Sequence, residues 1–308
     1  MNKRPFVMLF LGSLLALAGC SQKGPGEGEN VQIPLNSDSF TNSMSQGKLQ
    51  NDKIDEASGL VASRSNSKAY WTHNDSGGKS KLFLVDDTGK DLGVFTLKGI
   101  KARDWEDIAL GPGPKDGVNY LYVGEIGDNK AKYDEKMIYR IPEPDVSEVQ
   151  TPVKQKIKKD QIETIRFKYP DGKRDAEALM IDPTTKDIYI VTKREDGVRV
   201  YVARYPQSTQ EVNTLERVGT LDLHKIVAGD ISPDGKEVLL KDYGNIYYWK
   251  KSGDESIEEL LKTAPMRLPY IPEPQGESIA WKLDGSGFFT LSEERGGVEA
   301  ELYLYKRK

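Results

Sequence analysis

A short acidic motif that precedes a run of apolar residues recurs along this chain. RDWEDIAL at 103 to 110 is followed by RDAEALMI at 174 to 181. Related segments occur at five places: EASGLVAS (56 to 63), WEDIALGP (105 to 112), AEALMIDP (176 to 183), AGDISPDG (228 to 235) and GESIAWKLDG (276 to 285). Repetition at such intervals indicates one structural unit used several times. We call these segments the opening motifs.

Each opening motif is followed by two segments with the β-branched and aromatic content of strands. The first segment ends in a polar turn: YWTHNDSGG (70 to 78), YLYVGEIGDN (120 to 129), IYIVTKREDG (188 to 197), VLLKDYGN (238 to 245) and FFTLSEERGG (288 to 297). The second alternates aromatic and aliphatic residues: KLFLVDDTG (81 to 89), KMIYRIPEP (136 to 144), VRVYVARYP (198 to 206), GNIYYWKK (244 to 251) and ELYLYKRK (301 to 308). These patterns predict three consecutive strands in each unit.

A fourth strand is predicted after the third in every unit except the last. The segments are LGVFTLKG (92 to 99), IETIRFKY (162 to 169), LERVGTLDL (215 to 223) and IEELLKTAPMRL (257 to 268). Four antiparallel strands, repeated at roughly fifty-residue spacing, are typical of β-propeller blades. The sequence therefore predicts an all-β fold with five blades, or six if residues 106 to 177 contain a degenerate unit. We expect the segment around 31 to 35 to supply the missing outer strand of the last blade and to close the ring.

The N-terminus has a different composition. Lys3 and Arg4 precede an apolar stretch too short to span a bilayer, and the pattern ends in Leu-Ala-Gly-Cys at 17 to 20. It resembles a bacterial lipoprotein signal, in which the cysteine is lipidated after cleavage. We therefore expect a signal peptide at 1 to 19, a lipid anchor on Cys20, a flexible tether at 20 to 30 and a single propeller domain at 31 to 308. This organisation implies a lipid-anchored protein of the cell envelope on the outer side of the cytoplasmic membrane.

Charge and residue usage exclude several classes of function. The net charge of the 308 residues is -4, with 44 basic and 48 acidic residues, so no general basic surface for nucleic acid is predicted. Cys20 is the only cysteine, which excludes disulfides and thiolate metal sites. With only His73 and His224 as imidazole ligands, a zinc site is not favoured either.

In a propeller blade, the start of the first strand and the end of the second strand meet at the same rim. The opening motifs would therefore place acidic or hydroxyl groups around the central channel: Ser58 or Glu56, Glu106, Glu177, Asp230 and Glu277. Crowded carboxylates must be protonated, paired with arginine or neutralised by a cation. Oxygen ligands from several blades suit calcium. Arg103 and Arg174, three residues before Glu106 and Glu177, allow the alternative of structural ion pairs between blades.

The polar turns after the second strands would lie at the same rim and form a ligand-binding face. Candidate ligand-binding residues are Asn74, Asp128, Asn129, Lys193, Arg194, Lys241, Asp242 and Glu293. Acidic groups predominate in the first, second and fifth units and basic groups in the third and fourth. Such a face could bind a small anionic or sugar-like ligand, or a protein partner.

The strings EASGL, WTHNDSGG, DWEDIALGP and YVGEIGDN resemble the SdiA-regulated group of bacterial β-propeller lipoproteins, over most of residues 54 to 145. This resemblance implies a propeller but no particular chemistry. A weaker similarity is to calcium-dependent apyrases, which are five-bladed propellers with a ring of serine and glutamate around calcium. That similarity implies equivalent roles for Ser58, Glu106, Glu177 and Glu277.

Two hypotheses for function follow. The first is a lipid-anchored binding propeller with a calcium-type cation in its channel. The second is a metal-dependent hydrolase of phosphate esters or lactones, in which His73, Asp75 or Glu125 acts as general base. A Ser-His-Asp nucleophile is not favoured, because the chain has no G-x-S-x-G motif.

Overall fold

The computed structural model describes residues 32–75 and 79–308, in which nearly all regular structure is β-strand. Residues Ile33–Lys308 form one compact unit. The expected signal peptide at 1 to 19, Cys20 and the tether at 20 to 30 lie outside the described residues. None of the helices within the described ranges has the length and apolar character needed to cross a membrane.

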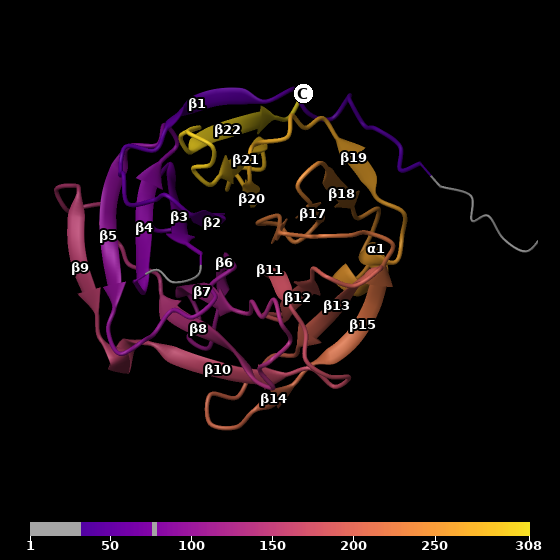
Figure 1. Ribbon diagram of the computed structural model, residues 1–308, viewed down its shortest axis with the longest axis horizontal. Coiled ribbons are helices and arrows are strands. Elements are labelled where there is room, and N and C mark those ends of the chain that lie inside the picture. Colours follow the sequence, from indigo (N-terminus) through magenta and orange to yellow (C-terminus); the bar gives the residue numbers. More distant parts are fainter. Residues whose placement is uncertain (1–31, 76–78) are drawn as a thin grey trace, which may run out of the picture. The chain divides into compact units, whose positions relative to one another are not determined.

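The strands form five sheets arranged as the blades of a β-propeller, which confirms the predicted fold class (Figure 1). The innermost strand of each blade begins in an opening motif, and the five strands contact one another in a ring. They are β2 (Ala57–Ala62), β6 (Asp107–Pro112), β11 (Ala176–Ile181), β16 (Ala228–Ile231) and β20 (Gly276–Trp281). Neighbouring blades cover both faces of these strands, so almost every residue in them is buried.

The second and third strands of every blade follow the predicted segments. The second strands are β3 (Ala69–Asn74), β7 (Asn119–Glu125), β12 (Ile188–Thr192), β17 (Glu237–Lys241) and β21 (Gly287–Ser292). The third strands are β4 (Lys81–Asp86), β8 (Lys136–Pro142), β13 (Val198–Ala203), β18 (Ile246–Lys250) and β22 (Glu301–Lys306). Their pairing is antiparallel throughout, as expected for strands joined by short turns.

The fourth, outermost strands include one from the N-terminal part of the described chain. They are β5 (Asp91–Leu97), β10 (Glu163–Lys168), β15 (Glu216–Leu221), β19 (Met266–Leu268) and β1 (Met44–Lys48). β1 pairs antiparallel with β22 and completes the fifth blade. The closing strand therefore lies further along the chain than the segment around 31 to 35 in which it was expected. Leu35 instead forms a parallel bridge with Arg267, beside β19.

The sequence MSQGK of β1 contains no β-branched or aromatic residue, which explains why strand propensity did not reveal it. Its pairing with β22 depends on backbone hydrogen bonds along the edge of the sheet, and these can be made by any residue except proline. The apolar segment near 31 to 35 was the more conspicuous candidate because its composition is closer to that of a strand.

The long stretch between Glu106 and Glu177 does not form a sixth blade. Its additional residues form β9 (Val153–Ile157), which runs parallel to β5 at the edge of the first blade, and a single 3-10 turn at Lys159–Gln161. In the second blade, β14 (Asn213–Thr214) adds a similar parallel edge to β10. Two blades therefore have five strands, and the number of blades among the described residues is five.

The segment IEELLKTAPMRL, predicted as one strand, contains the short helix α1 (Ile257–Leu261) before β19. Ser256 accepts a hydrogen bond from the backbone N–H of Glu259, and the Glu259 side chain reaches back to the Ser256 backbone N–H. This reciprocal cap is the sequence signal for a helix start that strand propensity had obscured.

Each pair of neighbouring blades encloses its own apolar core. Trp105 lies in the core between the first and second blades, and Trp281 lies with Phe40 in the core between the fourth and fifth. Because the fifth and first blades also share a core, the interface that closes the ring is packed like the other four. Closure therefore covers the apolar faces through which the first and fifth blades adjoin.

Candidate functional site

One rim of the channel gathers carboxylates from four of the five blades. The innermost and second strands pair antiparallel, so the start of β20 lies beside the end of β21 and the start of β11 beside the end of β12. Seven acidic residues form three overlapping groups in which the potential ligand atoms lie within 4.8 Å of one another: Asp75, Asp104, Glu106, Asp175, Glu177, Glu277 and Glu293. We call this set the channel mouth.

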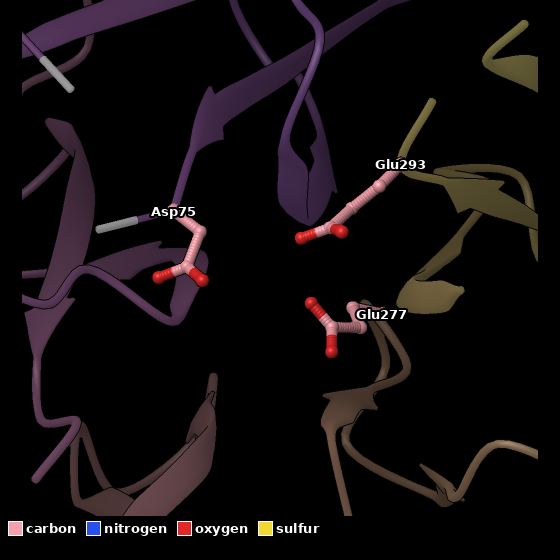
Figure 2. Close-up of side chains that lie close together, drawn as sticks. All are labelled: Asp75, Glu277 and Glu293. Atoms are coloured by element: carbon pink, nitrogen blue, oxygen red, sulfur yellow. The ribbon is translucent and has the colours of Figure 1, made fainter. Parts of the chain in front are cut away.

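The first group consists of Asp75, Glu277 and Glu293, from the first and fifth blades. Figure 2 shows their carboxylates facing a common space between the end of β3 and the strands of the fifth blade. Glu277 and Glu293 are 5% and 8% exposed, and neither forms an ion pair with a lysine or arginine among the described residues. The phenol of Tyr243 donates a hydrogen bond to Glu277 Oε1 at 2.5 Å.

A β-bulge places the opening glutamate of two blades at this rim. The register of β20 against β21 shifts between Gly276 and Ser278, and that of β11 against β12 shifts between Ala176 and Ala178. Glu277 and Glu177 are the additional residues at these shifts. Because a bulge leaves its extra residue outside the ladder, it can turn a side chain toward a site at the sheet edge.

The basic side chains at the mouth pair with the acidic residues of the third blade. Lys193 forms an ion pair with Glu177, and Arg194 pairs with Asp175 at 2.5 Å. Asp175 also accepts the backbone N–H of Asp128 at 2.7 Å. Burial raises the pKa of Glu177 to about 8 even though the Lys193 ammonium opposes this shift. Lys193 and Arg194 thus place one basic group beside each of these two carboxyl groups.

The carboxylates that the first, second and fifth blades contribute to the mouth have fewer basic side chains beside them. Burial and the neighbouring Glu177 hold the pKa of Glu106 well above its usual range. Burial and the adjacent Glu277 raise the pKa of Glu293 to about 8. Burial, followed by the charge of Asp175, also raises the pKa of Asp104. These shifts have the sign expected when acidic groups are crowded together away from water.

Neither arginine of the repeated motifs pairs with the glutamate three residues later. Arg103 lies 3.3 Å from Glu125, and Arg174 contacts Asp171 and Glu195. Both arginines thus form ion pairs, but with acidic residues other than Glu106 and Glu177. Glu106 has no cationic partner among the described residues.

Two residues expected in the ring of ligands have other roles. The Ser58 hydroxyl donates to the backbone carbonyl of Glu106, and Glu56, the alternative for this blade, is exposed. Asp230 Oδ2 accepts the backbone N–H of Trp281 at 2.8 Å, and Asp107 Oδ2 in the second blade accepts that of Leu179 at 2.9 Å. Asp230 and Asp107 thus each link the innermost strand of one blade to the innermost strand of the next blade.

His73 and Glu125, proposed as general bases, are held inside the protein. Glu125 is fully buried and accepts the backbone N–H groups of Arg103 and Asp104 at 3.0 and 2.8 Å. His73 is also fully buried, its Nδ1 lies 2.9 Å from the carbonyl oxygen of Asn74, and its ring packs edge-on against Trp105. Burial lowers the pKa of His73 to about 4. Only Asp75 of the three candidates lies in the channel mouth.

Asn74 and Asp242, two of the expected ligand-binding residues, hold loops in place. Asn74 donates to Lys53 O and Asp55 Oδ1. Asp242 accepts the backbone N–H groups of the following turn, and Asn129 is exposed.

Asp128 and Lys241 are also engaged. Asp128 forms a buried ion pair with Lys136 at 2.7 Å. Lys241 is buried and donates to the carbonyls of Gly276 and Asp242, and burial lowers its pKa to about 8. Lys241 thus supports the strand that carries Glu277.

A groove of about 540 Å³ adjoins the mouth between the third and fourth blades. Its lining includes Lys193 and Arg194, which were expected to bind ligand, together with His224, Lys225 and Tyr243. Lys193 donates to the Tyr243 hydroxyl at 2.9 Å, so the groove and the acidic group of Figure 2 share Tyr243. Open space thus lies beside charged side chains in this part of the rim.

Asp104 and Asp175 belong to the mouth but were not among the residues expected there. Each stands two positions before an opening glutamate, in the strings RDWE and RDAE. The repeated Asp-x-Glu spacing was the signal that could have identified them. Because these aspartates precede the innermost strands, their side chains can return to the rim beside the glutamates.

No family model matches the chain, and no curated protein sequence matches it. Among solved structures, a luciferin-regenerating enzyme is similar with a TM-score of 0.46 and 10% identity, covering 87% of this chain and 95% of that one. A nidogen/laminin complex is similar with a TM-score of 0.45 and 10% identity, covering 78% and 73%. The assignment of this chain to the β-propellers follows from its own strand pairing.

Proposed function

We propose that this protein is a lipid-anchored binding propeller of the cell envelope that holds a calcium-type cation at its channel mouth. The observation that carries the cation is the convergence of Asp75, Glu277 and Glu293 within 4.8 Å (Figure 2). Three carboxylates at such distances repel one another unless protons or a cation neutralise them. A bound cation would replace the proton that Glu293 otherwise retains near neutral pH.

Calcium fits this group better than other common metals. It takes six to eight oxygen ligands at about 2.3–2.6 Å in flexible geometry, and carboxylates supply them singly or in pairs. Among the described residues the mouth offers carboxylate oxygens and no thiolate, and the nearby His73 ring is packed against Trp105. Soft metals that prefer sulfur or imidazole are therefore disfavoured.

The same rim suits a ligand with an anionic group. Such a group could bind the cation while the rest of the ligand occupies the adjoining groove of about 540 Å³. Tyr243 presents an aromatic ring to this groove, and Lys225 and His224 offer donors without an acidic partner among the described residues. A small acid or phosphate ester has the required chemistry.

The positions of His73 and Glu125 favour binding over hydrolysis. A general base must reach a water molecule or a substrate proton within hydrogen-bond distance. Both side chains are fully buried, and both oxygens of Glu125 already accept backbone N–H groups. Of the three bases expected from the sequence, a metal-dependent hydrolase could use only Asp75, which the proposed cation occupies.

The cation is tested by thermal unfolding of the purified chain with calcium and with chelator. A ligand present at a hundred times its Kd stabilises the native state by about 2.7 kcal/mol, which for a domain of this size is roughly 5 °C in Tm. We expect calcium to produce such a rise and chelator to reverse it. The double variant Glu277→Gln/Glu293→Gln should lose the rise.

The matched control is Glu299→Gln in the same blade, whose side chain is 59% exposed and pairs with Lys48 at the surface. This variant should retain the full response to calcium. If calcium leaves the Tm of the unaltered protein unchanged, or if the double variant responds as the control does, the proposed cation site is wrong.

The anchor is a separate part of the proposal. It is supported by the lipoprotein-like signal that ends at Cys20 and by the resemblance of residues 54 to 145 to the SdiA-regulated propeller group. Fractionation of cells that produce the protein tests it. The unaltered chain should sediment with membranes and Cys20→Ser should not; equal distribution of the two would refute the anchor.

A further inference from the structure

A second carboxylate group lies beside the one drawn in Figure 2. Asp75, Asp104 and Glu106 place one ligand atom each within 4.8 Å of one another, so Asp75 belongs to both groups. Asp104 and Glu106 precede β6 in the second blade, whereas Glu277 and Glu293 belong to the fifth. Asp75 at the end of β3 thus lies between the acidic residues of two blades.

Glu106 provides an observation that is independent of this clustering. It is 5% exposed, and its carboxylate has no hydrogen-bond or ion-pair partner among the described residues. The basic residues that could neutralise it are engaged elsewhere: Arg103 with Glu125, and Lys193 with Glu177. Burying a charged carboxylate without a partner is costly, so Glu106 must bind a proton or a cation.

The surrounding backbone supports the convergence of Asp104 and Glu106. Glu125 accepts the backbone N–H of Asp104 at 2.8 Å and fixes the chain just before β6. At Gly127 a Cβ atom would lie 2.0 Å from Glu106 Oε1 and 2.6 Å from Asp104 Oδ2. A side chain at position 127 would therefore have to displace these two carboxylates.

The third carboxylate group, Glu106 with Asp175 and Glu177, is a weaker candidate for a cation. Lys193 and Arg194 already pair with Glu177 and Asp175. A cation there would have to displace or tolerate two basic side chains. A cation that neutralises Glu106 is therefore better placed beside Asp104 and Asp75 than beside Asp175 and Glu177.

We propose that the channel mouth binds two hard cations, with the second held by Asp104 and Glu106 and with Asp75 shared between the two sites. This inference rests on the proposed function, because the first cation is the one assigned to Asp75, Glu277 and Glu293. Shared carboxylates are a common way to hold two divalent ions near each other. The second site would neutralise Glu106, a buried carboxylate of the mouth that has no partner among the described residues.

The number of calcium ions bound by each purified chain tests this proposal. Equilibrium dialysis against calcium, followed by elemental analysis, should give two ions for the unaltered protein. Asp104→Asn should bind one ion and Glu293→Gln should also bind one, since each removes a ligand of a different site. Glu106→Gln, which keeps the shape of the side chain, provides a second variant for the new site.

Asp134→Asn is the matched control, because Asp134 is in the same blade with its side chain 82% exposed. It should bind two ions, and tryptophan fluorescence should show that each variant is folded. One ion in the unaltered protein, unchanged in folded Asp104→Asn and Glu106→Gln, would overturn the second site and leave the first intact. No bound ion in any of them would contradict the proposed function as well.

Discussion

The Tyr243 hydroxyl lies 2.5 Å from Glu277 Oε1 and 2.9 Å from Lys193 Nζ. A side chain of the fourth blade therefore connects the acidic group of the fifth blade to the Lys193–Glu177 ion pair of the third. The fourth blade itself contributes no carboxylate to the mouth among the described residues. Its contribution is a phenol that orients a carboxylate of the adjacent blade.

Replacing this phenol should weaken calcium binding. Groups that hydrogen-bond to metal ligands typically contribute 10- to 100-fold to affinity, so we expect Tyr243→Phe to raise the Kd for calcium by about tenfold. Titration calorimetry measures the change. The control is Tyr247→Phe, which removes a hydroxyl bonded to Asp242 outside the mouth. Equal affinities in these two variants would contradict the orienting role of Tyr243.

The ion pair between Lys136 and Asp128 should be important for stability. Both side chains are almost fully buried, and Asp128 also accepts the backbone N–H groups of Lys132 and Tyr133. Lys136→Met would leave a buried carboxylate without its cation, which typically costs about 3–5 kcal/mol. Urea denaturation should show this loss, and the exposed neighbour Lys132→Met should not. A cost below about 1 kcal/mol would show that solvent reaches the pair.

Asp230 should make the protein less stable as the pH rises. Burial raises its pKa to about 7, above its usual value, so the folded state favours the protonated carboxyl. This contribution is complete below the unfolded pKa of about 4 and is lost as the pH rises through 7. Urea denaturation of the unaltered protein and of Asp230→Asn, at pH 5 and pH 8, tests this dependence.

We expect the free energy of unfolding to fall less between these pH values in Asp230→Asn than in the unaltered protein. Asp234→Asn is the control, because hydrogen bonds from Ser232 and Lys236 hold the pKa of Asp234 below its usual range. Its contribution is already complete at pH 5, so its pH dependence should match that of the unaltered protein. The same match in Asp230→Asn would show that Asp230 is ionised throughout.

Phe40 should anchor the N-terminal segment that leads to β1. It is fully buried between the fourth and fifth blades, 5.2 Å from the Phe288 ring and 5.7 Å from the Tyr248 ring. Removing a buried phenylalanine side chain costs about 3–5 kcal/mol. Phe40→Ala should therefore lower the free energy of unfolding by that amount, whereas Leu35→Ala, at a residue that is 59% exposed, should change it little. Similar values for the two variants would argue against the closing role of this segment.

Most of the fold could be predicted from the sequence because the pattern is repeated. The three strands of each unit have strong aromatic and β-branched content, and five copies of one pattern reinforce one another. β1 could not be located in this way, since MSQGK has no such content. Helix α1 was missed because its apolar residues suit a helix or a strand equally well. Only the cap formed by Ser256 and Glu259 distinguishes the helix from a strand.

The site could be predicted only in part. A shift of a single residue in an innermost strand decides which side chain reaches the mouth. Glu106, Glu177 and Glu277 do reach the mouth, but Asp230 corresponds to Asp107 rather than to Glu106. A shift of one residue in a strand turns a side chain to the other face. The bulges that project Glu177 and Glu277 have no signature in their own sequence. The lipid anchor on Cys20 and the bound calcium remain predictions.

A crystal structure of the protein grown with calcium tests the central claim most directly. We expect density for an ion at the channel mouth, about 2.3–2.6 Å from carboxylate oxygens of Asp75, Glu277 and Glu293. Manganese in place of calcium should give an anomalous signal at the same position. A mouth that contains only water at saturating calcium, with no ion beside Glu277, would contradict the account.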